Sequence, residues 1–190
     1  MKIIDAERND AALIAWAVMT ALGDELCESF TSENQTLDDV RRLFTVCAES
    51  DDSQYSWKNA LVAVDDNGTR MGVIVAYDGA RLHELRKRFL DEFEKMHGFR
   101  IDEHMTDETS ADEYYLDSLA VLPEYRGRGI AGKLIAAAAR RGRETTGKRS
   151  GLLVDKTNHR AHTLYSKLGF EEKGERPFAG EMMYHMQLPD

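Results

Sequence analysis

The nine residues 126–134, RGRGIAGKL, decide the fold, because they join an expected strand to an expected helix through small residues. The run YYLDSLAVL (residues 114–122) is typical of a strand and stops before Pro123. GIAGKLIAAAARRGRE (residues 129–144) has the apolar spacing of an amphipathic helix. Small residues leave the backbone open, and the unpaired amides and dipole of a first helical turn favour an anion. The stretch therefore predicts a loop that holds a phosphate group.

This loop fits two phosphate-binding patterns, which imply different ligands. Counted from Gly127 it spells G-x-x-x-x-G-K, close to the loop of nucleoside triphosphatases, in which a Ser or Thr after the Lys holds a magnesium ion. Here that position is Leu134, which offers no ligand atom, and only 56 residues follow it. Counted from Arg126 it spells R-x-x-G-x-A, in which Arg126 and Arg128 add charge-assisted hydrogen bonds to a pyrophosphate. The sequence favours the second pattern.

Composition and charge limit the partners. The 190 residues suit one domain with a full-sized core, and 42% apolar with 31% charged residues is ordinary for a globular protein. The net charge of -9 argues against nucleic acid. Residues 123–176 hold 13 basic and 6 acidic residues, a balance of +7, whereas the rest hold 12 and 28, a balance of -16. A basic block in an acidic chain suits an anionic cofactor beside a cationic substrate, although charges that merely solvate helices give the same composition.

Other site classes find little support. Cys27 and Cys47 have no C-x-x-C spacing and no His cluster beside them, so we expect neither a disulfide framework, nor a metal site, nor a catalytic thiol. The N-terminus lacks the apolar stretch of a signal peptide, and the run AALIAWAVMTAL (residues 11–22) is too short to span a bilayer. These features predict a cytoplasmic protein with no membrane partner.

The apolar periodicity predicts a single α/β domain over residues 1–190, without repeats or linkers. Asn67-Gly68 is a strong turn signal between two β-rich runs. The expected strands are residues 2–5, 59–64, 70–77, 114–122, 151–155 and 181–188, and the expected helices are residues 10–22, 36–50, 80–98, 129–144 and 159–170.

Two stretches resemble the GNAT superfamily of N-acetyltransferases. LAVLPEYRGRGIAGKLIAAA (residues 119–138) is similar to the acetyl-CoA-binding segment of that family, whose signature is Q/R-x-x-G-x-G/A. NHRAHTLYSKLGF (residues 158–170) is similar to the next segment, an Asn followed by a helix that ends Y-x-x-x-G-F. The resemblance is strong over residues 114–170 and looser, by element order, over the hairpin at 59–76 and the N-terminal helices. It implies the GNAT fold, a central, mostly antiparallel mixed sheet flanked by helices.

The resemblance also implies a reaction and a cofactor site. An amine attacks the thioester of acetyl-CoA directly, without an acyl-enzyme and without a metal. The strand before the loop splays from its neighbour and pairs with pantetheine, and the Leu119 amide is a candidate donor to the thioester oxygen. The implied cofactor-binding residues are Leu119, Ala120, Val121, Arg126, Gly127, Arg128, Gly129, Ile130, Ala131, Gly132 and Asn158.

Two side chains are candidates for proton transfer. The resemblance makes Tyr165 the general acid that donates to the departing sulfur, although a half-buried Tyr on an amphipathic helix is the plain alternative. Asp117 stands where family members place a polar residue that relays the amine proton; a surface or salt-bridged Asp is the alternative. Strand alternation places Tyr115, Asp117, Leu119 and Val121 on one face, and Glu113 and Tyr115 are the reserves for the base.

The sequence departs from a minimal family member between the third and fourth strands. About 37 residues, 77–113, intervene and include the helix at 80–98 and an acidic stretch. This insertion is expected near the amine side of the cleft as a lid, a specificity element or a dimer surface. An acidic approach for a cationic amine is expected from Asp102, Glu103, Asp107, Glu108, Asp112 and Glu113.

The alternative function is a binding module of the same fold, which keeps the CoA site without turnover. The sequence leaves open whether the acceptor is a small-molecule amine or a peptide amine, and whether the acyl group is longer than acetyl. A homodimer is consistent with the resemblance, because dimers are frequent in this family.

Overall fold

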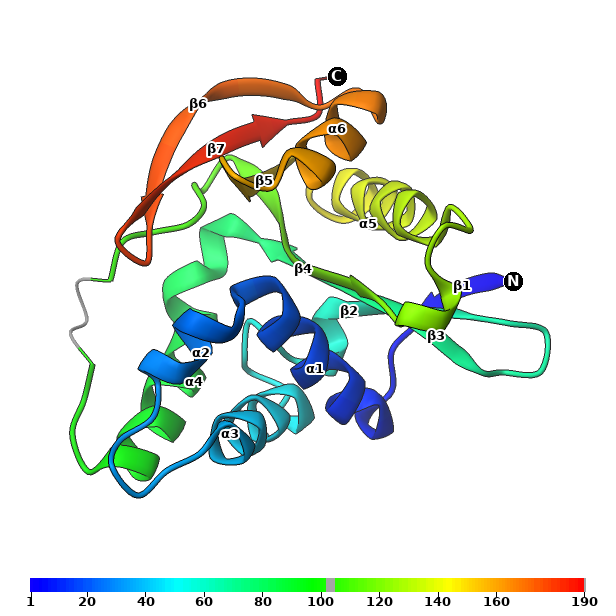
Figure 1. Ribbon diagram of the computed structural model, residues 1–190. Coiled ribbons are helices and arrows are strands. Elements are labelled where there is room, and N and C mark those ends of the chain that lie inside the picture. Colours follow the sequence, from blue (N-terminus) through cyan, green and yellow to red (C-terminus); the bar gives the residue numbers. More distant parts are fainter. Residues whose placement is uncertain (102–104, 190) are drawn as a thin grey trace.

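The computed structural model describes residues 1–101 and 105–189 as one mixed sheet with helices on both faces (Figure 1). The strands are β1 (Lys2–Asp5), β2 (Ala60–Val64), β3 (Arg70–Asp78), β4 (Glu113–Val121), β5 (Arg149–Asp155), β6 (Glu171–Phe178) and β7 (Glu181–Gln187). The helices are α1 (Ala11–Leu22), α2 (Asp24–Ser29), α3 (Leu37–Glu49), α4 (Leu82–His97), α5 (Ile130–Thr146) and α6 (His159–Lys167).

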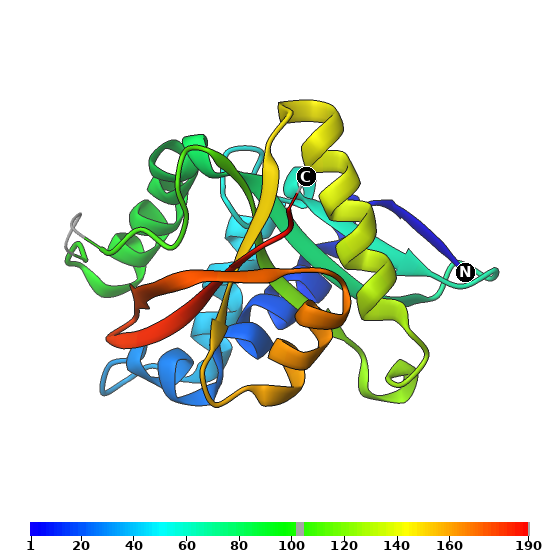
Figure 2. The same cartoon turned by 90° about the horizontal axis from the view of Figure 1, so that it is seen from above.

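The sheet is mostly antiparallel, as expected. Its seven strands follow the order β1-β2-β3-β4-β5-β7-β6. Every neighbouring pair in that order is antiparallel except β4 and β5. The central pair is parallel because α5 crosses from the end of β4 back to the start of β5 (Figure 2). The predicted fold class, a central, mostly antiparallel mixed sheet flanked by helices, is therefore confirmed.

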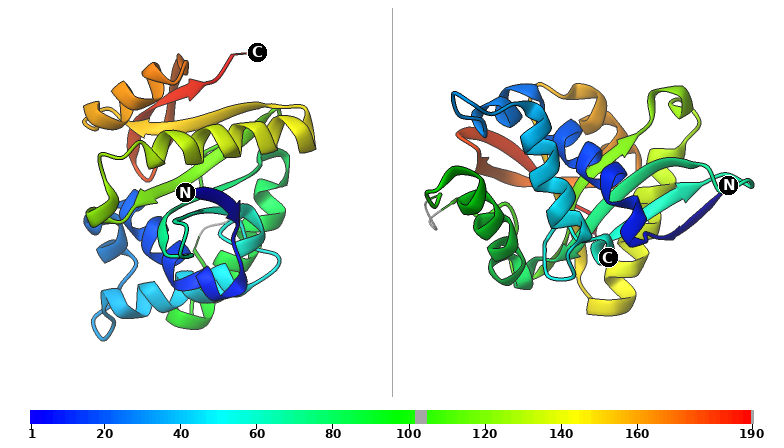
Figure 3. Two further views of the ribbon diagram at one scale, coloured as in Figure 1. Left: turned by 90° about the vertical axis from the view of Figure 1, so that its right-hand side faces the viewer. Right: turned by 90° about the horizontal axis from the view of Figure 1, so that it is seen from below.

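Helices cover the two faces of the sheet unequally (Figure 3). On one face α5 packs against β2, β3 and β4, with Leu134 and Ile135 in its buried stripe. On the other face α1 packs against β3 and β4, and α3 and α4 pack behind it around the fully buried Phe44. Burial of one such aromatic ring stabilises the fold by roughly 1.5–3 kcal/mol. These two cores fix β4 between α1 and α5.

Local signals explain most helix boundaries. Thr36 and Asp39 form a reciprocal capping box at the start of α3, which satisfies two backbone amides. Gly98 ends α4 in the left-handed conformation that a Gly adopts without strain. Both boundaries were expected from the sequence.

Two elements were not expected. Strand β6 is exposed along most of its length and lies at the edge of the sheet, so it lacks the apolar alternation of a half-buried strand. Pro177 in β6 also argues against a strand, although Pro is tolerated in an edge strand. The short α2 follows α1 directly after Gly23, and six residues are too few for a periodicity signal.

The central strands separate along their length. Strand β4 pairs with β5 only from Glu113 to Tyr115, opposite Arg149 to Gly151. Beyond Tyr115, the pairing found within residues 1–101 and 105–189 joins β4 to β3 and β5 to β7. Among those residues, the edge of β4 that faces away from β3 therefore has no strand partner from residue 116 to residue 121. The expected splay is confirmed.

Strand β4 also contains a bulge at Asp117. Ser118 pairs with Val75 on β3. The next pair along β3 joins Ala76 to Leu116, so Asp117 is an extra residue between two successive pairs. A bulge of this kind redirects the side chains that follow it.

The bulge overturns one expectation from strand alternation. Tyr115 pairs with Tyr77, and Asp117 accepts a hydrogen bond from the Tyr77 hydroxyl, so both lie on the face covered by α1 and α4. Leu119 and Val121 instead pack in the core under α5. The prediction that all four share one face is wrong, because one additional residue reverses the alternation.

Candidate active site

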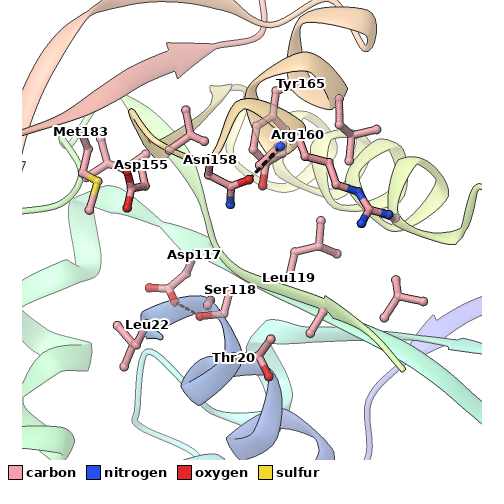
Figure 4. Close-up of a pocket in the computed structure, with 18 of the residues that line it drawn as sticks. Thr20, Leu22, Asp117, Ser118, Leu119, Asp155, Asn158, Arg160, Tyr165 and Met183 are labelled. Carbon is pink, nitrogen blue, oxygen red and sulfur yellow. Dashed lines mark hydrogen bonds between the residues drawn. The ribbon is translucent and has the colours of Figure 1, made fainter. Parts of the chain in front are cut away.

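A cavity of about 900 Å³ opens where β4 and β5 separate. Its walls come from β4, the end of β5, the loop before α5, one side of α6, the end of α1 with α2, and the β6–β7 turn. Figure 4 shows Asp117 and Leu119 on β4 between Thr20 of α1 on one side and Tyr165 of α6 on the other. The cavity therefore joins the two segments that carry the sequence motifs.

The loop before α5 presents backbone amides to this cavity. Gly127 and Gly129 have φ of 78° and 73°, a left-handed conformation that favours Gly. Among the described residues, the N–H groups from Gly127 to Gly132 have no backbone or side-chain acceptor. Five of these six residues line the cavity, Arg128 being the exception. Such a row of free amides at the start of a 17-residue helix is suited to an anion.

The two loop arginines lie differently. Arg126 lines the cavity, and its Nε donates to the Val121 carbonyl oxygen at 3.0 Å. Arg128 donates to the Glu124 carbonyl oxygen at 3.0 Å and places its guanidinium 5.3 Å from the centre of the Tyr125 ring. The side chain of Arg128 does not line the cavity, so its contact with a ligand stays a prediction.

Strand β4 supplies the floor of the cavity. Leu119, Ala120 and Val121 all line it, and they lie in the part of β4 whose second edge has no strand partner. Alternate backbone groups along that edge are free to bond an extended ligand as a strand would.

Helix α6 brings Asn158 and Tyr165 to the opposite wall (Figure 4). Asn158 is the N-cap: its Oδ1 accepts a hydrogen bond from the Ala161 amide at 3.0 Å. Tyr165 is partly buried against Phe170, and burial raises the pKa of its hydroxyl to about 12. At neutral pH this hydroxyl keeps its proton and is a donor.

Asp117 lies among hydroxyl groups and a second acid. Its Oδ1 accepts from Ser118 at 2.6 Å, and its Oδ2 accepts from Tyr77 at 3.2 Å. Burial, followed by the negative charge of Glu108, raises the pKa of Asp117 to about 7, against the opposing effect of these hydrogen bonds. A carboxyl group with this pKa can accept a proton at neutral pH.

The reserve candidates for the base lie elsewhere or titrate too high. Glu113 is fully buried outside the cavity, where it bonds His185 at 2.8 Å and Thr109 at 2.8 Å. Its carboxylate lies so close to Gly151 that a methyl group there would overlap it. Tyr115 lines the cavity, but burial raises the pKa of its hydroxyl well above the ordinary value. Glu113 is thus a packing residue, whereas Asp117 lines the cavity.

Comparison with known proteins identifies the family. Residues 19–170 match the acetyltransferase (GNAT) family. The chain belongs to the GNAT acetyltransferases. Proteins of this family use acetyl-CoA and act on amines.

Individual GNAT relatives agree with this assignment. A Bacillus subtilis (strain 168) protein, named provisionally as an alanine N-acetyltransferase of ribosomal protein bS18, is 34% identical over 65 residues, which are 34% of this chain and 43% of that protein. The match thus spans less than half of that relative. A crystal structure of an acetyltransferase is 26% identical over 99% of this chain and 98% of its own, with a TM-score of 0.76. An N-acetyltransferase from Staphylococcus aureus Mu50 is 24% identical, covers 99% and 100%, and has a TM-score of 0.79, which shows the fold.

The acidic stretch of this GNAT chain is only partly what the sequence predicted. Glu108 is buried and lines the cavity. Asp107 is exposed and pairs with Arg86, and Asp112 is exposed and does not line the cavity. Asp102 and Glu103 lie outside the described residues. The prediction that Glu113 belongs to an acidic approach is therefore wrong, because Glu113 faces His185. Of the predicted acidic residues that the structure describes, only Glu108 lines the cavity.

Two functional candidates escaped the sequence analysis. Tyr77 and Gln54 both donate a hydrogen bond to Oε1 of Glu108. The Tyr77 hydroxyl oxygen lies 3.1 Å from it, and the Gln54 amide nitrogen lies 3.2 Å from it. Tyr77 reaches the site through the register of β3 with β4, and Gln54 reaches it from the segment before β2. Neither the strand register nor the position of the segment before β2 can be predicted from the order of residues in a sequence motif.

Other site types find no counterpart in the part of the chain that the structure describes. Within residues 1–101 and 105–189, no group of three or more His, Cys, Asp or Glu side chains could hold a metal ion. Over the same residues, no helix combines the length and apolar character needed to cross a bilayer. Cys27 and Cys47 are buried free thiols, and burial raises the pKa of Cys47 to about 12, so its reactive thiolate is suppressed.

Proposed function

We propose that this GNAT chain transfers the acetyl group of acetyl-CoA to a primary amine by direct attack. The observation that carries the proposal is the single cavity that joins a row of free loop amides to Asp117 and Tyr165. One part of this cavity is suited to a diphosphate and the other to proton transfer.

The free amides from Gly127 to Gly132 and the side chain of Arg126 would hold the diphosphate of CoA. The open edge of β4 at Leu119 to Val121 would pair with the pantetheine arm, and Asn158 would border it from α6. Acetyl-CoA supplies the thioester carbon that the amine attacks. Because the protein fixes this ligand along a strand, the thioester would lie near the point where β4 and β5 part.

Asp117 is proposed as the general base. An amine enters as its ammonium ion, and only the neutral amine has the lone pair for attack. Asp117, with a pKa of about 7, would take one ammonium proton at neutral pH. Activity should therefore rise with pH through the titration of this group.

Tyr165 is proposed as the general acid. Its hydroxyl projects into the cavity from α6 and keeps its proton below a pKa of about 12. Donation of this proton to the sulfur would neutralise the thiolate as the carbon–sulfur bond breaks.

The test combines binding with turnover. Titration calorimetry should show CoA binding, and release of free thiol should report acetylation of members of an amine panel. Tyr165→Phe should lower kcat by about 10²-fold, because one general acid typically contributes at least that much, and should leave the CoA affinity within a few-fold of wild type.

Tyr184→Phe is the matched control. Tyr184 carries the same hydroxyl but lies on β7 outside the cavity, beside His162. Its removal should leave kcat unchanged. CoA binding without acetylation of any amine would instead assign the chain as a silent CoA-binding module, and absence of CoA binding would overturn the proposal entirely.

A further inference from the structure

One hydroxyl group lies between two carboxyl groups at the edge of the cavity. The Tyr77 hydroxyl oxygen is 3.1 Å from Oε1 of Glu108 and 3.2 Å from Oδ2 of Asp117. Tyr77 is 2% exposed, and burial with the charges of Glu108 and Asp117 raises its pKa well above the ordinary value, so it stays protonated. A phenol has a single hydrogen to donate. It can therefore satisfy only one of these carboxyl groups at a time.

The number of hydrogens available between Glu108, Tyr77 and Asp117 favours one negative charge on the two carboxyl groups over two. When both carboxyl groups are ionised, one of the two contacts brings together oxygen lone pairs with no hydrogen between them, and the like charges repel. When one carboxyl group is protonated, it donates to the Tyr77 oxygen, and Tyr77 donates to the other. Both contacts are then hydrogen bonds.

Arg86 decides which carboxyl group stays ionised. Its guanidinium, 4% exposed, bonds Oε2 of Glu108 and lies 3.1 Å from Asp107. The Gln54 amide nitrogen donates to the other oxygen of Glu108 at 3.2 Å, but Gln54 also acts to lower the pKa of Asp117, so Arg86 is the group that distinguishes the two acids. Asp117 makes no ion pair among the described residues. The proton therefore belongs on Asp117, and Glu108 keeps its charge.

We propose that the described part of the β3–β4 connection (residues 79–101 and 105–112) delivers Glu108 as a positioning residue that acts on Asp117 through Tyr77, so that Asp117 is the carboxyl group that takes up a proton and Glu108 the one that stays ionised. This inference rests on the proposed function for the role of Asp117 as base. The pairing itself is measurable without turnover.

The connection is built to present this acid. Arg86 projects from α4, and the chain on the far side of the connection folds back over it: the carbonyl oxygens of Met105 and Thr106 accept from its guanidinium at 3.3 and 3.4 Å. These contacts place Glu108 with its carboxyl group toward β3 and β4. The connection thereby becomes part of the catalytic end of the cavity.

The proton balance follows directly. One N–H bond of the bound ammonium breaks, its hydrogen passes to Asp117, and the electron pair stays on the nitrogen for the attack. Asp117 and Glu108 together then carry one negative charge. After the product has left, Asp117 releases the proton to solvent. The titratable or charged groups that face Asp117 or line the cavity near it are Tyr55, Tyr77, Arg86, Glu108, Tyr115, Glu25, Asp155 and Glu181.

The test is a titration of Asp117 by ¹³C NMR of Asp-labelled protein, assigned by the resonance lost in Asp117→Asn. Glu108→Gln keeps an oxygen that can accept from Tyr77 but removes the charge. The Asp117 pKa should then fall by about one pH unit or more, and the acid limb of kcat/KM should move to lower pH by the same amount. The control is Glu25→Gln, the same change at an exposed acid that lines the cavity, which should shift the titration far less.

Tyr77→Phe tests whether Glu108 acts on Asp117 through the Tyr77 hydroxyl. This variant keeps both carboxyl groups and removes the oxygen that accepts from protonated Asp117, so the Asp117 pKa should fall, and an unchanged pKa would overturn the action through Tyr77. Tyr77→Phe added to Glu108→Gln should lower the Asp117 pKa no further, because the charged partner of Tyr77 is already gone. A purely structural role, in which removal of the hydroxyl admits water, would lower it again in the double variant, which would also overturn the inference. A wild-type Asp117 that titrates below about pH 5 would overturn it as well. Because NMR needs no substrate, a protein that acetylates nothing but shows these shifts would refute the proposed function alone.

Discussion

Asp117 carries a cost in stability for the raised pKa that suits it to the proposed role of base. Its pKa is raised in the folded protein from the ordinary value of 3.8 to about 7, so folding favours the protonated form. The stability that this group contributes is therefore highest below about pH 4 and is lost as the pH rises through about 7. Residues that are strained or desolvated for function often destabilise the fold in this way.

Replacement of Asp117 by Asn should expose this cost. Asp117→Asn should be more stable than wild type by on the order of 1–3 kcal/mol at pH 8, and the difference should shrink toward pH 4, because the wild-type group is then protonated in the folded state. Urea denaturation at the two pH values measures both differences. Equal differences at pH 4 and pH 8 would show that Asp117 is an ordinary carboxylate. Loss of acetyl transfer in the same variant would show that the residue that destabilises the fold at high pH is also required for the reaction.

At the level of single residues, the motif was sufficient for some members of the site and not for others. Asp117 and Tyr165 were predicted from their positions relative to two recognisable segments, and both reach the cavity. Tyr77 was not predicted, because its role depends on the register that places it opposite Tyr115. The face of Leu119 was predicted wrongly, because a one-residue bulge is set by pairing with β3 rather than by the sequence of β4.

Among the elements, α5 combines the two constraints of packing and ligand contact through different glycines. A Cβ at Gly142 would lie 2.4 Å from the Tyr114 ring, which cannot retreat freely because its hydroxyl donates to the Ala76 carbonyl oxygen at 3.0 Å. Gly142→Ala should therefore lose on the order of 1–3 kcal/mol of stability, despite a gain of about 1 kcal/mol in helix propensity. Thermal or urea denaturation measures this loss, and an unchanged stability would contradict the close packing of α5 on β4.

Gly132, on the same helix, should behave in the opposite way. A Cβ there would lie 3.6 Å from Leu168 in ordinary contact, so Gly132→Ala should keep the wild-type stability or gain up to about 1 kcal/mol. The added methyl group would stand in the first turn of α5, which lines the cavity, and should weaken CoA binding by roughly tenfold. Calorimetry of CoA binding beside denaturation separates the two effects. Loss of stability without loss of affinity would remove Gly132 from the site.

The prediction of helices and strands failed where a segment is exposed and therefore has no apolar periodicity. The amphipathic helices and the central strands followed from apolar periodicity, because each buries one face or both. Strand β6 is exposed on most of its residues and is held by its pairing with β7, which the local sequence does not encode. The connection at residues 79–112 was predicted as a helix and an acidic stretch, but its path back to the cavity depends on Arg86 and Glu108.

Across the whole molecule, the uneven charge of the sequence becomes a polarity of the cavity. Of the cavity-lining residues, the basic ones are Arg126 and Arg160, which stand toward the loop before α5. The acidic ones are Glu25, Glu108, Asp117, Asp155 and Glu181. Figure 4 shows Asp155 and Asp117 toward one end and Arg160 toward the other. This arrangement suits a polyanion at one end and a cationic amine at the other, although the net charge of the chain is -9.

The local charges should outweigh the net charge in cofactor binding, and Arg126 and Arg128 form a matched pair to test this. Arg126→Gln should raise the Kd for CoA by roughly threefold to tenfold, because Arg126 lines the cavity, and the effect should shrink between 0.02 and about 0.3 M salt as screening reaches contact distances. Arg128→Gln changes the net charge equally but removes a guanidinium that lies on Tyr125, so it should have a smaller effect. Equal effects of the two variants at each salt concentration would mean that CoA responds to the overall charge, and that the cavity has no polarity of its own.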